Sequence, residues 1–180
     1  TEIYTLSLHD ALPISRAENP DKIILFKPHP DVEAGLRPGH VPDAEALRYA
    51  DQVLHKSDPA ALLDQVEEVW TMTSLLGFEA LLRGKRVTCV GAPFYAGWGL
   101  TRDLGPTPAR RQARPDLLQL AHAVLIAYPR YFDPASGLPC PPEVVVERLA
   151  HGPLPRPSPG NRTLAKLQGF FAGHAGIWRR

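Results

Sequence analysis

The chain has 180 residues, of which 44% are hydrophobic and 22% charged, the composition of a globular protein long enough for one domain. Its formal net charge of +1 removes a strong electrostatic argument for nucleic-acid binding. No apolar run approaches the roughly 20 residues that cross a bilayer, and the two cysteines, Cys89 and Cys140, fit neither a metal pattern nor a disulfide framework, which favours a reducing, cytoplasmic compartment.

Residues 1–15 are predicted to be foreign to the protein. The chain begins with Thr1 rather than Met, and TLSLHDALPI at residues 5–14 resembles the translation of a common sequencing-library adapter. We therefore expect an adapter-derived artefact up to Ser15 and a natural sequence that starts near Arg16, within a larger protein. The alternative is a genuine helix-and-turn segment, and in either case His9 and Asp10 are excluded from a site.

The first buried strand is predicted over residues 22–26, KIILF, a continuous apolar run typical of a strand covered on both faces of a parallel sheet. It leads directly into KPHPD, where two prolines hold His29 in an extended turn at the carboxyl edge of the sheet. Ligands bind at that edge in open α/β sheets. There His29 can donate to a phosphate or protonate a leaving group, with Lys27 adding charge. A loop histidine without a function is the alternative.

Helices and strands are expected to alternate through the next segment. A helix is predicted over residues 43–49, a strand over 51–54, and a helix over 60–63 with Asp58 as its cap. This alternation is typical of a Rossmann-like lobe with a parallel sheet, an α/β fold.

The most informative stretch is residues 69–100, which predicts a strand, a helix and a second strand. The strands cover residues 69–72 and 86–90, and Leu and Phe residues recur at helical spacing between them. Ser74 is a natural helix N-cap, and Gly84 lies where a helix ends in the left-handed conformation.

The start of this helix is a candidate anion site. A helix N-terminus beyond a strand favours a phosphate, and Thr73 and Ser74 would add hydroxyl groups. Glu79 lies five residues further, about 7.5 Å along the axis, roughly the distance from the phosphate of a nucleotide to its ribose hydroxyls. The alternative is an ordinary capped helix with a solvated glutamate.

Aromatic and basic residues follow the second strand. Tyr95 and Trp98 lie in a glycine-containing loop and could cover the base or sugar of a nucleotide, wedge two lobes together, or pack as structural residues. Four arginines could meet an acidic ligand or be solvated equally well: Arg102, Arg110, Arg111 and Arg114.

The rest of the chain predicts two helices and a tail. The helices cover residues 116–127, where His122 is expected on the surface, and 141–149. Residues 151–180 read as a Pro-rich linker and a basic tail. The tail could be a weak amphipathic membrane anchor, but its three glycines favour a flexible segment.

Several known types of site are excluded by their missing motifs. No G-x-G-x-x-G follows a strand, and Gly-Lys at residues 84–85 lacks the spacing and the Ser or Thr of a phosphate loop. No His, Cys and Asp cluster has metal-ligand spacing, and no nucleophile elbow is present.

Three segments together resemble one family: KPHPD, TSLLGFEALLRGK and VTCVGAPFYAGWGLT. They are similar to the capsule polysaccharide β-Kdo transferases, and the later YPRYFDPASGLPC and PPEVVVERL fit the same modules, so the resemblance covers residues 22–149. It implies the carboxyl-terminal lobe of a two-lobed GT-B module, with residues 16–150 binding the nucleotide of CMP-Kdo. It also implies inverting transfer of Kdo, an eight-carbon acidic sugar, to a lipid-linked primer, with no cofactor besides this donor and no metal.

The resemblance assigns roles to residues of the matching motifs. His29 would contact the leaving phosphate and is the candidate catalytic residue. Donor binding would fall to five residues: Lys27, Pro30, Thr73, Ser74 and Glu79. The general base is expected on an amino-terminal lobe that this chain lacks, so the isolated chain is expected to be inactive.

The partners implied are CMP-Kdo, the lipid-linked glycan primer, the missing lobe, the capsule-export machinery and the inner-membrane surface. Two alternatives stay open. One is another GT-B enzyme, a sugar-nucleotide epimerase or a polyol-phosphate transferase. The other is a non-catalytic capsule-export subunit that keeps this lobe for assembly.

Overall fold

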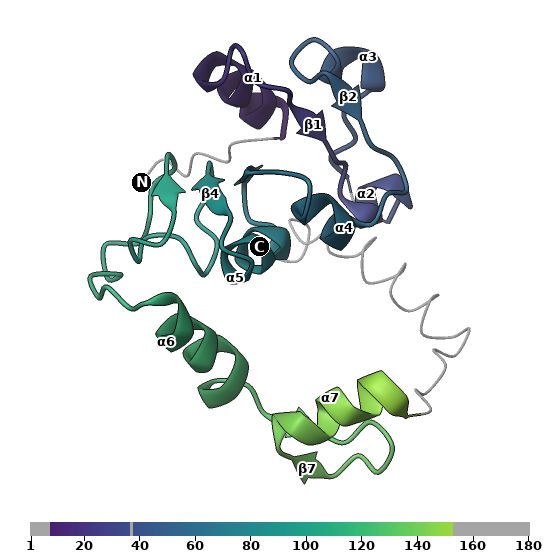
Figure 1. The fold of residues 1–180 in the computed structure, drawn as a ribbon, viewed down its shortest axis with the longest axis vertical. Helices are drawn as coiled ribbons and strands as arrows, with labels where there is room; N and C mark the ends of the chain where they lie inside the picture. Colours follow the sequence, from purple (N-terminus) through teal and green to yellow (C-terminus); the bar gives the residue numbers. More distant parts are fainter. Residues whose placement is uncertain (1–7, 37, 153–180) are drawn as a thin grey trace, which may run out of the picture. The chain divides into compact units, whose positions relative to one another are not determined.

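The computed structural model describes residues 8–36 and 38–152 and divides the chain into two compact units, Thr1–Leu120 and Ala121–Arg180 (Figure 1). The elements of the first unit, in chain order, are α1 (Leu8–Glu18), β1 (Leu25–Phe26), α2 (Pro30–Glu33), α3 (Asp43–Ala46), β2 (Gln52–Val53), α4 (Pro59–Leu63), β3 (Glu68–Thr71), α5 (Leu75–Leu82), β4 (Arg86–Cys89) and β5 (Arg102–Asp103). Helix α6 (Leu117–His122) lies at the boundary between the two units.

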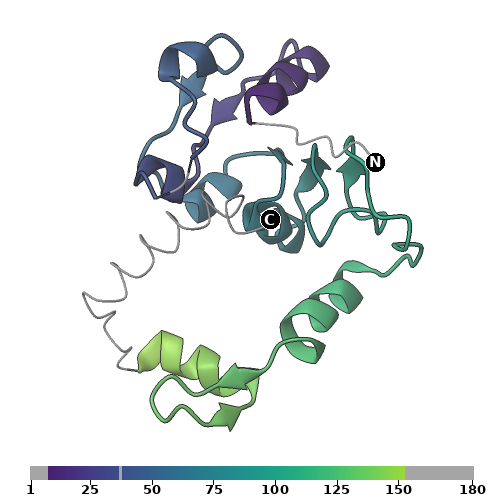
Figure 2. The ribbon, with the colours of Figure 1, turned by 180° about the vertical axis from the view of Figure 1, so that it is seen from behind.

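The strands of the first unit are all parallel, which confirms the α/β fold class. β1 pairs with β2, and β4 lies between β3 and β5. The predicted parallel strands are therefore divided between a two-stranded and a three-stranded sheet. Helix α5 packs on β3 and β4, and α1 contacts β3, an arrangement that can be followed from behind in Figure 2.

The prediction of a buried strand over residues 22–26 is wrong in its first half. Ile23 is 80% exposed, and β1 consists of two residues only. Side chains take the place of a strand partner here: Arg16 Nη1 donates to the Lys22 carbonyl at 2.9 Å, and the Ile24 amide donates to Asp51 Oδ2 at 2.7 Å. Side chains therefore bind the Lys22 carbonyl and the Ile24 amide, and backbone pairing with the segment of β2 begins only at the Ile24 carbonyl, which accepts from the Asp51 amide at 2.9 Å.

Two groups of apolar side chains fill the first unit. One joins α1, β1 and α3 through Leu12, Phe26, Val41, Ala46 and Ala50. The other surrounds α5 and β4 and includes three aromatic rings, in which Phe94 meets Phe78 and Tyr95 with centroids 5.1 Å apart in each pair. The second group holds the start of α5, where the candidate anion site lies.

The predicted caps at Asp58 and Ser74 and the predicted end of α5 are confirmed, whereas the helix predicted over residues 43–49 ends at Ala46. Asp58 Oδ1 accepts from the Ala60 amide at 3.0 Å, and Ser74 Oγ accepts from the Leu76 amide at 3.2 Å. Gly84 follows α5 with φ of +68°, the left-handed conformation that glycine adopts without strain.

The second unit contains a π-helical turn η1 (Ala123–Ala127), strands β6 (Tyr131–Phe132) and β7 (Pro139–Cys140), which pair antiparallel, and α7 (Pro142–His151). Asp133 holds the hairpin, because its carboxylate accepts from Ser136 Oγ at 3.0 Å and from Arg148 Nε at 3.2 Å. The antiparallel pair was not expected from the sequence. The linker and tail were predicted over residues 151–180; His151 belongs to α7 instead, and residues 153–180 lie outside the described residues.

Candidate functional site

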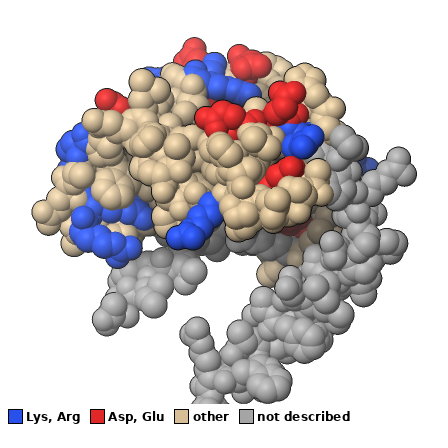
Figure 3. Space-filling view, turned by 90° about the horizontal axis from the view of Figure 1, so that it is seen from below, with Lys and Arg blue, Asp and Glu red and all other residues tan. Residues whose placement is uncertain are grey.

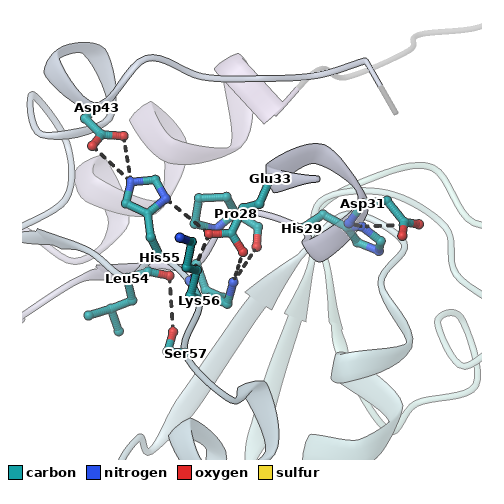
Figure 4. Close-up of polar contacts among 10 residues, drawn as sticks. Pro28, His29, Asp31, Glu33, Asp43, Leu54, His55, Lys56 and Ser57 are labelled. Atoms are coloured by element: carbon teal, nitrogen blue, oxygen red, sulfur yellow. Dashed lines mark hydrogen bonds and ion pairs between the residues drawn. The ribbon is translucent and has the colours of Figure 1, made fainter. Parts of the chain in front are cut away.

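The His29 loop, residues 27–31, begins where β1 ends (Figure 4). His29 is the N-cap of α2, and its Nδ1 accepts from the Asp31 amide at 3.1 Å. Because Nδ1 is the acceptor, the ring proton of a neutral His29 is on Nε2, which is then a hydrogen-bond donor. The side chain is 39% exposed, so a ligand can reach this nitrogen.

Lys27 and Pro30 flank this histidine but differ in what they can contact. The Lys27 ammonium is bonded to the Glu33 carboxylate and to the Pro28 carbonyl, and its side chain is only 11% exposed. The Lys27 ammonium is thus paired with Glu33, and its part in donor binding stays a prediction. Pro30 is exposed and opens α2, where its fixed φ suits the first helical position.

The second candidate group lies at the start of α5, directly after β3. Ser74 Oγ accepts from the Leu76 amide, so its hydroxyl proton remains to be donated to a ligand. The Ser74 amide donates to Thr71 Oγ1 at 3.2 Å, which fixes the turn between the strand and the helix. Thr73 is exposed beside this cap. The helix start thus presents two hydroxyl groups together with the positive end of the helix dipole.

Glu79 lies on the same helix and is half-buried. Within residues 8–36 and 38–152, no hydrogen bond or ion pair engages its carboxylate. Both oxygens can therefore accept hydrogen bonds from a ligand such as the two hydroxyls of a ribose. Thr73 and Ser74 directly precede α5 and Glu79 lies within it, whereas His29 follows a strand of the other sheet.

Tyr95 differs from the prediction that it could contact a nucleotide as part of a lid. Its side chain is completely buried, and its hydroxyl donates to the Ser74 carbonyl at 2.5 Å. Burial also raises the pKa of this hydroxyl, so it remains a donor. Tyr95 can therefore act on a ligand only through Ser74.

Trp98 remains a candidate contact. Its ring is half-buried, its Nε1 donates to the Phe94 carbonyl at 2.7 Å, and the Arg111 guanidinium lies 5.6 Å from the ring centroid. Arg111 Nη1 also donates to the Pro93 and Ala96 carbonyls at 2.6 and 2.8 Å. The sequence left open whether Arg111 contacts a ligand or is solvated. In the structure, these hydrogen bonds stabilise the loop that contains Trp98.

The sequence analysis missed a group of charged residues beside the His29 loop. Glu33, Asp43 and His55 are linked by short contacts that Figure 4 shows. A signal was present, because His55 comes two residues after β2, the parallel neighbour of β1. Polar residues that follow neighbouring parallel strands meet at one edge of a sheet.

A hollow of about 300 Å³ lies elsewhere, against the first residues of β3 and β4, and none of the predicted site residues lines it. Both of its arginines are paired, Arg86 with Glu67 at 3.6 Å and Arg102 with Glu18 at 2.7 Å. Acidic and basic side chains are also mixed on the face drawn in Figure 3. In the part of the chain that the structure describes, no cluster of His, Cys, Asp and Glu could hold a metal, and no helix is long and apolar enough to cross a membrane.

Comparison with known proteins identifies the family. The family model described as "Capsule polysaccharide biosynthesis protein" matches residues 7–131. The capsule polysaccharide modification protein LipA of Neisseria meningitidis serogroup A is 54% identical over 127 residues, which are 71% of this chain and 18% of LipA. The lipopolysaccharide-processing protein LpsZ of Rhizobium meliloti is 46% identical over 123 residues, 68% of this chain and 28% of LpsZ.

Two solved structures are similar in fold. The beta Kdo 2,7 transferase of Thermosulfurimonas dismutans KpsC superposes with a TM-score of 0.69 at 37% identity, over 79% of this chain and 45% of that chain. The beta Kdo 2,4 transferase of the same KpsC gives a TM-score of 0.67 at 38% identity, over 77% of this chain and 43% of that chain.

The chain spans less than a third of the length of the curated relatives and less than half of the solved chains. The resemblance expected from the three sequence motifs is nevertheless confirmed, because the family model covers 7–131 of the 180 residues. This chain belongs to the family of capsule polysaccharide biosynthesis proteins.

Proposed function

We propose that this chain is the donor-binding lobe of a glycosyltransferase that transfers β-Kdo from CMP-Kdo to a lipid-linked primer in capsular polysaccharide synthesis. The observation that carries the proposal is the start of α5, where a capping serine and an unengaged glutamate lie on one helix. The fold around that helix is similar to two solved β-Kdo transferases at 37% and 38% identity, which supports the choice of sugar.

The donor nucleotide would lie along α5. The Ser74 hydroxyl and the free backbone amide of Leu75 would bind the phosphate, with Thr73 beside them. The Glu79 carboxylate would accept from both ribose hydroxyls, since its distance along the helix is about 7.5 Å from the cap. Trp98 is a candidate contact for the base or the sugar. In this arrangement no cofactor is required, because CMP-Kdo is the substrate that supplies the sugar.

His29 would act on the leaving group. As the bond between the Kdo anomeric carbon and the phosphate oxygen breaks, negative charge develops on the phosphate of CMP. The Nε2 hydrogen of His29 would donate to that oxygen and stabilise the charge. The primer hydroxyl attacks the opposite face of the anomeric carbon and inverts it, and its proton passes to a base. We assign that base to no residue of this chain.

The partners of the whole protein follow from the same proposal. A second GT-B lobe would complete the acceptor side and supply the general base, so the chain by itself would not transfer sugar. The lipid-linked primer would bring the enzyme to the cytoplasmic side of the inner membrane as a peripheral protein, near the capsule-export machinery.

Calorimetric titration of the chain with CMP tests the proposal, with UMP and ADP as comparisons. We expect CMP to bind best, and Glu79→Ala to weaken it by about tenfold or more, because two charge-assisted hydrogen bonds are lost. The matched control is Glu143→Ala, which removes an exposed glutamate of α7 and should leave CMP affinity unchanged.

Three results would contradict the proposal. Equal CMP affinity with and without the Glu79 carboxylate would refute its role at the ribose. Preference for UMP by the folded chain would favour another GT-B enzyme, and no nucleotide binding at all would favour a lobe that serves assembly only.

A further inference from the structure

A network of charged groups joins the segments that follow β1 and β2 (Figure 4). The Glu33 carboxylate of α2 binds the Lys27 ammonium through one oxygen. Its other oxygen accepts from the Lys56 amide at 3.0 Å and lies 3.1 Å from His55 Nδ1. His55 Nε2 lies 2.9 and 3.0 Å from the two oxygens of Asp43, at the start of α3. His55 therefore lies between two carboxylates that belong to different helices.

The geometry defines the charge of this histidine. A neutral imidazole has one N–H and one acceptor nitrogen, but a carboxylate can only accept. Both nitrogens of His55 face carboxylate oxygens at hydrogen-bond distance, and both can donate only when the ring is an imidazolium, so this arrangement favours the protonated form. The hydrogen bonds that His55 donates to Asp43 and then to Glu33 accordingly raise its pKa above the ordinary 6.5.

Glu33 is the member that connects the network to the candidate site. Its side chain is 15% exposed, and the hydrogen bond from Lys27 is the largest of the influences that lower its pKa from 4.5 to about 2. The amides of Val32 and Glu33 donate to the His29 carbonyl at 2.9 and 3.0 Å. The position of Glu33 thus fixes the backbone of His29.

The backbone next to His55 is also adapted to this contact. Lys56 has φ of +50°, in the left-handed region that is unfavourable for a residue other than glycine. Among the residues that the structure describes, Lys56 is the only one other than glycine with a positive φ. In this conformation its amide points at the Glu33 carboxylate. Strain of this kind persists only where surrounding contacts over-determine it, and it gathers at functional sites.

We propose that His55 is a positioning residue: as an imidazolium it ties α2 to α3 and so holds the loop that presents His29 to the donor. The inference rests on the proposed function in taking the donor to be a CMP-sugar. It assigns no contact between His55 and the donor. The charged groups around His55 are Glu33 and Asp43 at its nitrogens, Lys27 beyond Glu33, its neighbour Lys56, and Glu45, which α3 also contains.

The sign of the pH effect follows from this arrangement. A group whose pKa is raised by folding contributes fully below its unfolded value, here 6.5, and the contribution is lost as the pH rises through the raised value. Donor binding that depends on the His55 cation must therefore weaken with rising pH in that window. Glu33 stays ionised throughout, because its pKa is about 2.

The test is a pH profile of CMP affinity from pH 5.5 to 9 on the full chain, with His55→Arg as reference. Arginine keeps a positive charge and several donors at every pH, so titration of the CMP phosphate and of other groups cancels in the ratio of the two profiles. We expect the CMP affinity of the wild type, divided by that of His55→Arg, to fall about tenfold between pH 5.5 and 9, because one charge-assisted hydrogen bond is lost. His55→Gln should bind weakly at every pH, and His122→Gln, which changes an exposed histidine of α6, should match the wild type.

Imidazole titration by NMR separates this inference from the proposed function. We expect the pKa of His55 to exceed 6.5 and to fall in Asp43→Asn. A flat affinity ratio while His55 loses its proton would overturn the positioning role. If CMP does not bind at all, the proposed function fails. The positioning role of His55 is then tested by hydrogen exchange of the Val32 and Glu33 amides. His55→Gln should accelerate their exchange, and unchanged rates would overturn the inference.

Discussion

Among single residues, Tyr95 contributes to the candidate phosphate site through the hydrogen bond of its hydroxyl group. The Ser74 carbonyl accepts from this hydroxyl and from the Gly77 amide at 3.2 Å, so two donors fix the first turn of α5. Because Tyr95 comes 21 positions after Ser74, the bond ties the loop after β4 to the helix cap.

Tyr95→Phe should therefore destabilise the protein without changing its apolar packing. We expect a loss of about 1 kcal/mol in the free energy of unfolding, the net contribution of a buried hydrogen bond together with the carbonyl left with one donor fewer. Urea denaturation measures it. Tyr128→Phe, which removes a hydroxyl from an 88% exposed side chain, is the control. Equal stability of the two variants would show that the Tyr95 bond contributes nothing.

At the scale of elements, α5 is a helix whose position depends on one glycine. The helix is defined by the Ser74 cap, by buried Phe78 and Leu81 on its inner face, and by Gly84 after its end. Gly77 lies where the helix approaches Tyr95, and a Cβ built there would lie 2.2 Å from the Tyr95 hydroxyl oxygen and 2.9 Å from Thr71 Cγ2. The helix can pack this close to β3 only because residue 77 has no side chain.

Gly77→Ala should be destabilising although alanine favours helices by roughly 0.8–1.0 kcal/mol over glycine. Overpacking costs about 1–3 kcal/mol, so we expect a net loss of about 1 kcal/mol or more in the free energy of unfolding. Gly77→Ala in the Tyr95→Phe background should reduce the free energy of unfolding by less, because the Tyr95 hydroxyl oxygen, the atom nearest to the new Cβ, is absent. Additive losses in the double variant would contradict the close contact.

At the scale of the whole molecule, the fully buried hydrophobic residues of the described chain all lie between Leu12 and Leu120. The described part of the second unit contributes one buried residue, the polar Asp133. The candidate site residues, from Lys27 to Trp98, belong to the first unit as well. The core and the candidate site therefore coincide in one part of the chain.

A chain that ends at Leu120 should fold and bind CMP with the affinity of the full chain, because it keeps the whole described core. We expect the free energy of unfolding to change by less than about 1 kcal/mol. A chain that ends at Pro108 is the control, since it also lacks Arg111, which braces the loop after β4, and buried Leu120. Loss of cooperative unfolding on truncation at Leu120 would show that the second unit stabilises the first.

Several local features of the fold, and the family, could be predicted from the amino-acid sequence. The caps at Asp58 and Ser74 and the left-handed Gly84 were predicted correctly, because each depends on residues within a few positions along the chain. The aromatic-glycine run and the KPHPD motif identified the family for the same reason, since a motif is a local string.

Which polar side chains are paired and which are free depends on tertiary packing, and the sequence did not predict it. Tertiary packing buried Tyr95 beneath Ser74, occupied Lys27 with Glu33, and placed His55 between two carboxylates 12 and 22 positions away. It also shortened β1 at its amino end, where Arg16 and Asp51 bind the backbone of Lys22 and Ile24. Such contacts join residues that are distant in the chain, so their geometry depends on how the whole unit packs and not on any local pattern.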